Sequence, residues 1–110
     1  MLSIRLYLAQ RITAMLMAPL VLLHLGVMVY AIQGGLTSSE ILGRTQGSLF
    51  WGLTYGLFVV ALSIHAAIGL RVVIHEWFGL NESLLNWITY AITLLLLGLG
   101  GRAVYAVVMS

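Results

Sequence analysis

Three long runs of apolar residues divide the chain, at roughly residues 12–33, 49–74 and 84–108. An α-helix rises about 1.5 Å per residue, so each run is long enough to cross about 30 Å of hydrocarbon. All three acidic residues lie outside these runs. The pattern predicts an all-α membrane protein with three transmembrane helices, forming a single domain over residues 1–110.

The two connecting segments contain signals for where helices begin. The first follows Gly34-Gly35, and its Thr37-Ser38-Ser39-Glu40 fits a capping box for a short helix at the membrane interface. The second is tight, because Phe78-Gly79-Leu80-Asn81 turns the chain, and Asn81 suits the N-cap of the third long helix. We therefore expect one interfacial helix between the first two spans and a direct turn between the last two.

An odd number of spans places the chain ends on opposite sides of the membrane. Arg5, Arg11 and Arg71 then lie on one side, and Arg44 and Arg102 lie on the other. Basic residues are enriched on the cytoplasmic side, so this small excess favours a cytoplasmic N-terminus.

Composition agrees with a membrane protein and removes several kinds of chemistry. The chain is 62% hydrophobic and 7% charged, with a mean hydropathy of +1.09, far from the profile of a soluble domain. The absence of cysteine excludes disulfides, thiolate metal sites and thiol catalysis. A net charge of +2, spread over separate loops, forms no basic patch, so we expect no nucleic-acid partner. We expect no catalytic residue in this chain and a function that belongs to a complex.

Two histidines lie inside apolar runs, where ionisable side chains are costly and usually functional. His24 is in the first run and His65 is in the second. Both are candidate axial ligands of haem iron, which needs a neutral imidazole aimed into a flat apolar slot. The alternative for each is a structural histidine that hydrogen-bonds to a neighbouring helix. Gly69, on the same helix face as His65, would let either a porphyrin or another helix approach.

The depths of the two histidines indicate whether one haem could use both. From the expected cytoplasmic edge, His24 lies 13 residues beyond Arg11, roughly 20 Å, and His65 lies six residues before Arg71, roughly 9 Å. A bis-histidine haem holds both ligands close to one line through the iron, so an offset of about 10 Å argues against one shared haem. We therefore predict two haems stacked across the membrane, each with a second ligand from another chain.

Small residues indicate association with further helices. Ala61, Ala66 and Gly69 in the second span, and Gly98 and Gly101 in the third, offer faces where backbones can approach closely. Three helices are also too few to enclose a large cofactor. The chain is thus expected to be half of a haem-binding bundle, completed by a second anchor subunit or a second copy of itself.

One membrane edge combines hydrogen-bond donors, acceptors and aromatic rings beside hydrocarbon. A quinone head group needs this mixture, because its carbonyls accept hydrogen bonds and its reduction takes up two protons while its tail stays in lipid. The alternative is that interfacial arginines and aromatic residues only anchor the helix ends. The residues at this edge are Tyr7, Gln10, Arg11, Thr13, Arg71, His75, Glu76 and Trp77.

Basic residues near the ends of the spans are candidates for binding haem propionates. Arg71 and His75 lie at the edge with the quinone candidates, and Arg102 lies near the opposite edge, after Gly100-Gly101. Arg102 either pairs with a propionate or extends its charge to the interface without a specific partner.

Two segments carry a likeness to a known family. Gln10-Arg11-Ile12-Thr13-Ala14 is similar to a His-Arg-x-Ser/Thr-Gly/Ala signature, and His65-x-x-x-Gly69-x-Arg71 with Glu76 is similar to His-x-x-x-Gly-x-Arg-His-x-x-x-Asp. Both signatures belong to the cytochrome b membrane anchors of succinate:quinone oxidoreductase (complex II) and fumarate reductase, which the chain resembles over most of its length. The second segment also resembles the smaller anchor's His-Ala-x-Ile-Gly followed by Asp-Tyr, so the likeness fits both anchors.

The resemblance implies that His65 is a ligand of haem b. His24, in the middle of the first span, resembles the ligand of those anchors that hold two haems. Val72 replaces the family's second histidine, which lies near the haem propionates.

The resemblance also implies that Arg11 contacts quinone. Trp77 stands where the smaller anchor has its quinone-binding tyrosine, and Tyr7 stands where many relatives have a quinone-contacting serine. Gln10 replaces the family's usual histidine, and Glu76 replaces its aspartate.

The family's setting follows from the same resemblance. It implies a bacterial inner membrane, a flavoprotein subunit, an iron–sulfur subunit and a second anchor, with electrons passing between the iron–sulfur subunit and quinone. Succinate oxidation in the tricarboxylic acid cycle, or fumarate reduction, would take place on the flavoprotein. Two other classes fit the sequence: a haem-binding anchor of another membrane-bound dehydrogenase, and a small non-redox accessory subunit whose histidines are structural.

Overall fold

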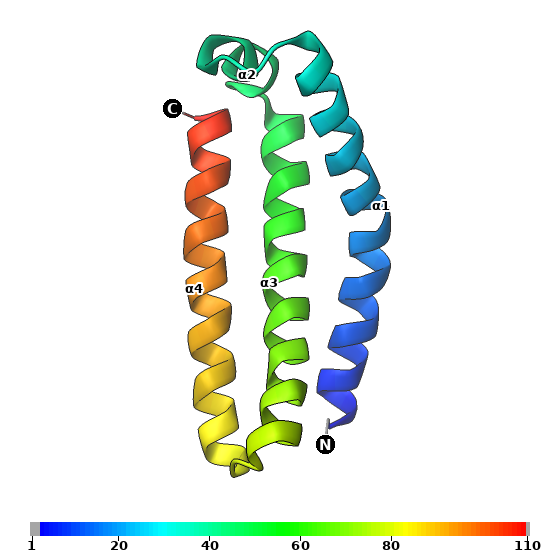
Figure 1. Ribbon diagram of the computed structural model, residues 1–110, viewed down its shortest axis with the longest axis vertical. Coiled ribbons are helices and arrows are strands. Elements are labelled where there is room, and N and C mark those ends of the chain that lie inside the picture. Colours follow the sequence, from blue (N-terminus) through cyan, green and yellow to red (C-terminus); the bar gives the residue numbers. More distant parts are fainter. Residues whose placement is uncertain (1–2, 110) are drawn as a thin grey trace.

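The computed structural model describes residues 3–109, and this part of the chain contains four helices. They are α1 (Ile4–Gly34), α2 (Ser38–Thr45), α3 (Leu49–Phe78) and α4 (Glu82–Val108). The three long helices run side by side in a bundle of 48 × 23 × 23 Å, and α2 lies across one end (Figure 1). α1, α3 and α4 are each long and apolar enough to cross a membrane. The predicted all-α fold with three helices able to span a membrane is confirmed, and a short helix lies between the first two, as expected.

The helices extend beyond the apolar runs that predicted them. α1 begins eight residues before the first run, at Ile4, because the Ser3 hydroxyl accepts a hydrogen bond from Leu6 N at 3.3 Å and caps the helix. α3 continues to Phe78 and ends at Gly79, whose φ of 61° is left-handed. Apolar runs mark the part that hydrocarbon can cover, whereas caps decide where the helical backbone ends.

Both predicted N-caps are present. The Thr37 hydroxyl accepts a hydrogen bond from Glu40 N at 3.3 Å and donates one to Glu40 Oε1 at 2.7 Å. Asn81 Oδ1 accepts from Leu84 N at 2.8 Å at the start of α4. These caps satisfy backbone N–H groups that have no partner inside their helices.

The segment after α2 is tied to the C-terminal end of α4. The Thr45 hydroxyl donates to the Val107 carbonyl, and Gly47 N donates to the Val108 carbonyl at 2.6 Å. The chain ends lie at opposite ends of the bundle, with α2 at the end opposite Ile4, as an odd number of spans requires (Figure 1).

α3 is the central helix and packs against both α1 and α4. The two helices α3 and α4 are in close contact at Gly100, where an added Cβ would lie only 2.5 Å from Val59 Cγ1. Gly98 and Gly101 have no atoms of the described chain within 4 Å of an added Cβ. Gly100 therefore allows the close contact between α4 and Val59 of α3, while Gly98 and Gly101 face away from the neighbouring helices of this chain, where the further helices expected from the sequence could approach.

Candidate haem and quinone sites

His65 projects from α3 toward α1, where two acceptors hold its ring. His65 Nδ1 lies 3.2 Å from Thr13 Oγ1 and 3.3 Å from the Gln10 carbonyl. The Thr13 hydroxyl proton is directed to the Ala9 carbonyl at 2.7 Å, so its oxygen is free to accept. A carbonyl can only accept as well, and Nδ1 must therefore carry the proton. This tautomer leaves the lone pair on Nε2, the form that an axial iron ligand requires.

Gln10 fills the space beside Gly69 that the sequence left open to a porphyrin or a helix. A Cβ on Gly69 would lie 3.8 Å from Gln10 Nε2, an ordinary van der Waals contact, so the Gln10 side chain lies next to this glycine. Gln10 Oε1 is buried and has no hydrogen-bond partner in the described part of the chain. Gly69 therefore faces α1 within this chain, and Gln10 contributes a buried acceptor without a partner in the described residues.

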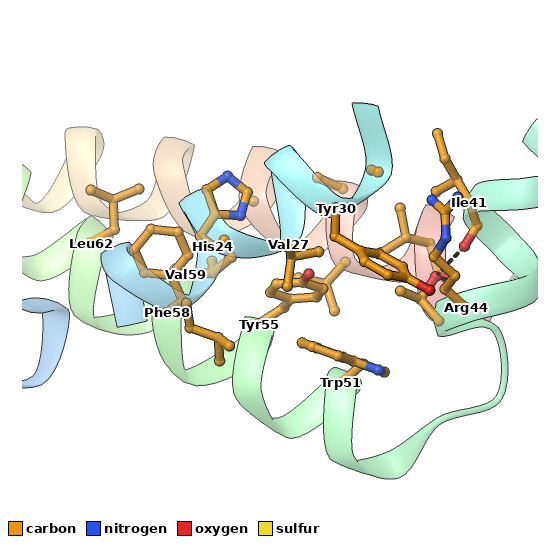
Figure 2. A pocket seen from close by; sticks show the side chains of 18 of the residues that line it. His24, Val27, Tyr30, Ile41, Arg44, Trp51, Tyr55, Phe58, Val59 and Leu62 are labelled. Atoms are coloured by element: carbon orange, nitrogen blue, oxygen red, sulfur yellow. Dashed lines mark hydrogen bonds between the residues drawn. The ribbon is translucent and has the colours of Figure 1, made fainter. Parts of the chain in front are cut away.

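His24 lies in an aromatic environment and makes no hydrogen bond within the described residues. Its ring centroid is 5.4 Å from that of Phe58 and 6.1 Å from that of Tyr55, which it meets edge to face (Figure 2). His24 Nδ1 is buried without a partner. The alternative role, a structural histidine that hydrogen-bonds to a neighbouring helix, needs a hydrogen-bond partner for this ring, and the described residues supply none. A buried ring nitrogen without a hydrogen bond is costly unless a further group satisfies it.

The ring of His24 borders a cavity of about 880 Å³, which we call the His24 cavity. All four helices contribute to its walls, and the lining is almost entirely apolar and aromatic. This volume lies within the range of about 300–1,000 Å³ that is typical of ligand and cofactor pockets. Arg44 is the single lining residue with a formal charge among those described. An imidazole beside a large apolar space is what haem ligation needs.

The two histidines lie at different levels of the bundle. His65 meets α1 at Thr13, whereas His24 is 11 residues further along the same helix, about 16 Å at 1.5 Å per residue. On α3, Phe58 beside His24 precedes His65 by seven residues, about 10 Å. The offset expected from the sequence is present, so the two rings cannot lie on one line through a single iron.

Arg71 faces α4 and is held there by neutral groups. Its side chain is only 6% exposed, and Nη1 donates to Asn86 Oδ1 at 2.8 Å and to Thr89 Oγ1 at 3.2 Å. Among residues 3–109 it forms no ion pair. One turn later, His75 Nδ1 is buried without a partner. The contacts of Arg71 with α4 are thus separate from the contacts of His65 with α1.

The remaining quinone candidates lie exposed at the same end of the bundle as the α3–α4 turn. Tyr7 and Arg11 are on the first turns of α1, and Glu76 and Trp77 are at the end of α3, where Trp77 is 77% exposed. No hydrogen bond links these four side chains within the described structure. Arg102 is exposed near the other end and does not line the His24 cavity.

Sequence reasoning missed two of these features. It treated Arg44 only as an interfacial charge, although it is the charged residue on the His24 cavity, and it gave Asn86 no role, although it holds Arg71. Asn86 follows Arg71 by 15 residues across a tight turn, and two helices joined by such a turn are antiparallel neighbours. This spacing was a signal that could have paired them.

Comparison with known proteins gives one match. The family model described as the succinate dehydrogenase/fumarate reductase transmembrane subunit matches residues 2–107. Neither the curated proteins nor the solved structures gave a match. The family model covers nearly the whole chain, including His24, His65 and almost all of the three long helices, and the chain therefore belongs to the succinate dehydrogenase/fumarate reductase transmembrane subunit family.

Proposed function

We propose that this chain anchors a succinate:quinone oxidoreductase or fumarate reductase in the membrane and supplies one axial ligand to each of two b-type haems. The observation that carries the proposal is the pair of half-buried histidines at two levels of the α1–α3 interface, each with a ring nitrogen free of hydrogen bonds in the described structure. Membership of the family supports the type of complex.

The two histidines are suited to haem binding by different features of their surroundings. His65 offers a fixed tautomer and a fixed ring direction, because Thr13 and Gln10 both accept from Nδ1. His24 offers an apolar cavity beside its ring, with aromatic walls from Tyr55 and Phe58. When bound, haem b supplies one-electron redox chemistry at its iron. The chain's part is to orient the imidazoles and to exclude water.

Quinone is expected at the edge where α1 begins and α3 ends. Arg11 supplies a charged donor, Tyr7 and Trp77 supply aromatic rings with polar ends, and Glu76 is a carboxylate that can deliver protons to a reduced head group. These side chains are exposed within this chain, which suits a site completed by a neighbouring subunit. Electrons would pass there between quinone and the iron–sulfur subunit.

The proposed complex also contains a flavoprotein, on which the succinate or fumarate chemistry takes place, and a second anchor or a second copy of this chain. The exposed apolar faces of α1 and α4 are suited to that second anchor and to lipid. We place the N-terminus in the cytoplasm of a bacterial cell and the spans in its inner membrane, from the excess of arginines at that end.

Co-purification with haem tests this proposal. The chain, tagged and expressed in its own operon context, should purify with a flavoprotein and an iron–sulfur protein. The dithionite-reduced minus oxidised spectrum of that complex should contain b-type haem bands, which His65→Ala should weaken. Thr93→Val, which removes a hydroxyl that bonds only the Thr89 carbonyl among the described residues, serves as a control and should leave the bands unchanged. A complex without haem, or a chain that purifies without redox subunits, would contradict the proposal.

A further inference from the structure

We propose that Arg44 binds the propionate carboxylates of the haem at the His24 level and thereby sets the potential of that haem. The inference rests on the proposed function, because it requires a haem on His24. It assigns to Arg44 the propionate-binding role that the sequence suggested for Arg102 at this end of the bundle.

The first support is position. Arg44 lies on α2, the short helix across the end of the bundle, and its side chain reaches the His24 cavity (Figure 2). His24 lines the same cavity about 9 Å deeper along α1, judged from Tyr30, over which the Arg44 guanidinium lies. A porphyrin has an apolar ring around the iron and two carboxylates on one edge. The cavity offers an imidazole in its apolar part and a cation at its membrane edge.

The second support is that the guanidinium is held in place. Arg44 Nη2 donates to the Gly35 carbonyl at 2.9 Å, and its central carbon lies 5.3 Å from the Tyr30 ring centroid. Gly34 leaves room for it, since a Cβ there would lie 3.0 Å from Arg44 Nη2. An arginine fixed at two points loses little further freedom when it binds an anion.

The third support is that the charge of Arg44 has no acidic partner in residues 3–109. Glu40, one turn earlier on α2, accepts instead from the Thr37 hydroxyl. A guanidinium has five N–H donors, and Arg44 uses one of them in the described structure. The remaining donors suit a carboxylate, which arginine binds through two parallel hydrogen bonds. A phospholipid phosphate at the membrane surface offers the same anionic chemistry, and the experiment below separates it from haem.

The experiment is a potentiometric titration of the haems in the intact purified complex, comparing wild type with Arg44→Gln, Arg44→Lys and Arg102→Gln. The haem concerned is the one lost in His24→Ala. A nearby cation stabilises the reduced haem, so Arg44→Gln should lower its midpoint potential by about 59 mV, a tenfold change in the one-electron equilibrium constant. Arg44→Lys keeps the charge and should recover at least half of that shift. Arg102→Gln removes an exposed charge at the same end and should leave the midpoint unchanged.

Several results would overturn the assignment. These are an unchanged midpoint in Arg44→Gln, an equal fall in Arg102→Gln, or a fall in Arg44→Lys as large as in Arg44→Gln. An unchanged midpoint with loss of a co-purifying phospholipid, measured by mass spectrometry, would assign Arg44 to lipid instead. Failure of the proposed function itself is separate, since it appears in the wild-type complex as the absence of any haem that depends on His24.

Discussion

Thr13→Val should raise the midpoint potential of the haem bound to His65. The Thr13 hydroxyl accepts from His65 Nδ1 at 3.2 Å, and this bond makes the imidazole a stronger electron donor to iron. A stronger donor stabilises the oxidised iron, so removal of the bond favours the reduced form. Valine keeps the shape of threonine, and Thr13 is only 6% exposed, so the substitution tests the hydroxyl with little change in packing.

The size of the effect follows from the strength of one neutral hydrogen bond. Such a bond contributes about 0.5–1.5 kcal/mol. If it stabilises only one oxidation state of the iron, its loss shifts the midpoint potential by about 20–60 mV. The Gln10 carbonyl remains as an acceptor at 3.3 Å, so the upper value is a ceiling. The assay is a redox titration of the purified complex, monitored in the haem bands.

A matched control is available in α4. Thr93 also donates to the carbonyl one turn back, at 2.8 Å from Thr89 O, and makes no hydrogen bond to either intramembrane histidine. Thr93→Val should leave both haem potentials unchanged. A fall in potential for Thr13→Val, no change, or an equal rise in both variants would refute the reasoning about His65.

Two further perturbations test packing and quinone binding. Gly100→Ala should destabilise the complex by about 1–3 kcal/mol, because its methyl group overlaps Val59, and the thermal unfolding midpoint should fall. Gly43→Ala, on α2 with open space around it, should not lower that midpoint, and Val59→Ala should restore the stability of Gly100→Ala. Arg11→Gln should raise the KM for quinone about tenfold by removing a charge-assisted hydrogen bond, with haem content unchanged. Arg5→Gln is its control, and equal KM values for both variants would remove Arg11 from the quinone site.

The apolar runs predicted the three spans, and side-chain oxygens at Thr37 and Asn81 predicted where two helices begin. Both signals are local, because hydrocarbon thickness and unpaired backbone N–H groups act on a few consecutive residues. The start of α1 at Ile4 was not predicted, since the cap at Ser3 lies outside the apolar run. Helix ends in water depend on single side chains more than on hydropathy.

The partners of the buried polar residues required the fold. From the sequence, Arg71 was grouped with Arg11 by depth alone. Arg71 follows His65 by six residues, so the side chains of His65 and Arg71 leave α3 in directions about 120° apart. His65 therefore faces α1 while Arg71 faces Asn86 on α4. Depth follows from counting residues, whereas direction also needs the positions of the neighbouring helices.

The surroundings of His24 were not predicted, for a similar reason. His24 was a candidate haem ligand from its depth, but the walls of the His24 cavity come from four helices, with lining residues from Leu22 to Val107. Arg44 reaches this cavity because α2 folds back over the end of the bundle. The sequence located α2 correctly and had no means of showing which way its arginine points.

Haem stoichiometry in single and double histidine variants tests the central claim most directly. Haem would be extracted from the purified complex and counted against the iron–sulfur subunit. The account predicts two haems per complex for wild type if the second anchor is a different protein, with a different one lost in His24→Ala and in His65→Ala and none left in the double variant. A His24→Ala complex with the full wild-type complement of haem would contradict it and make His24 structural.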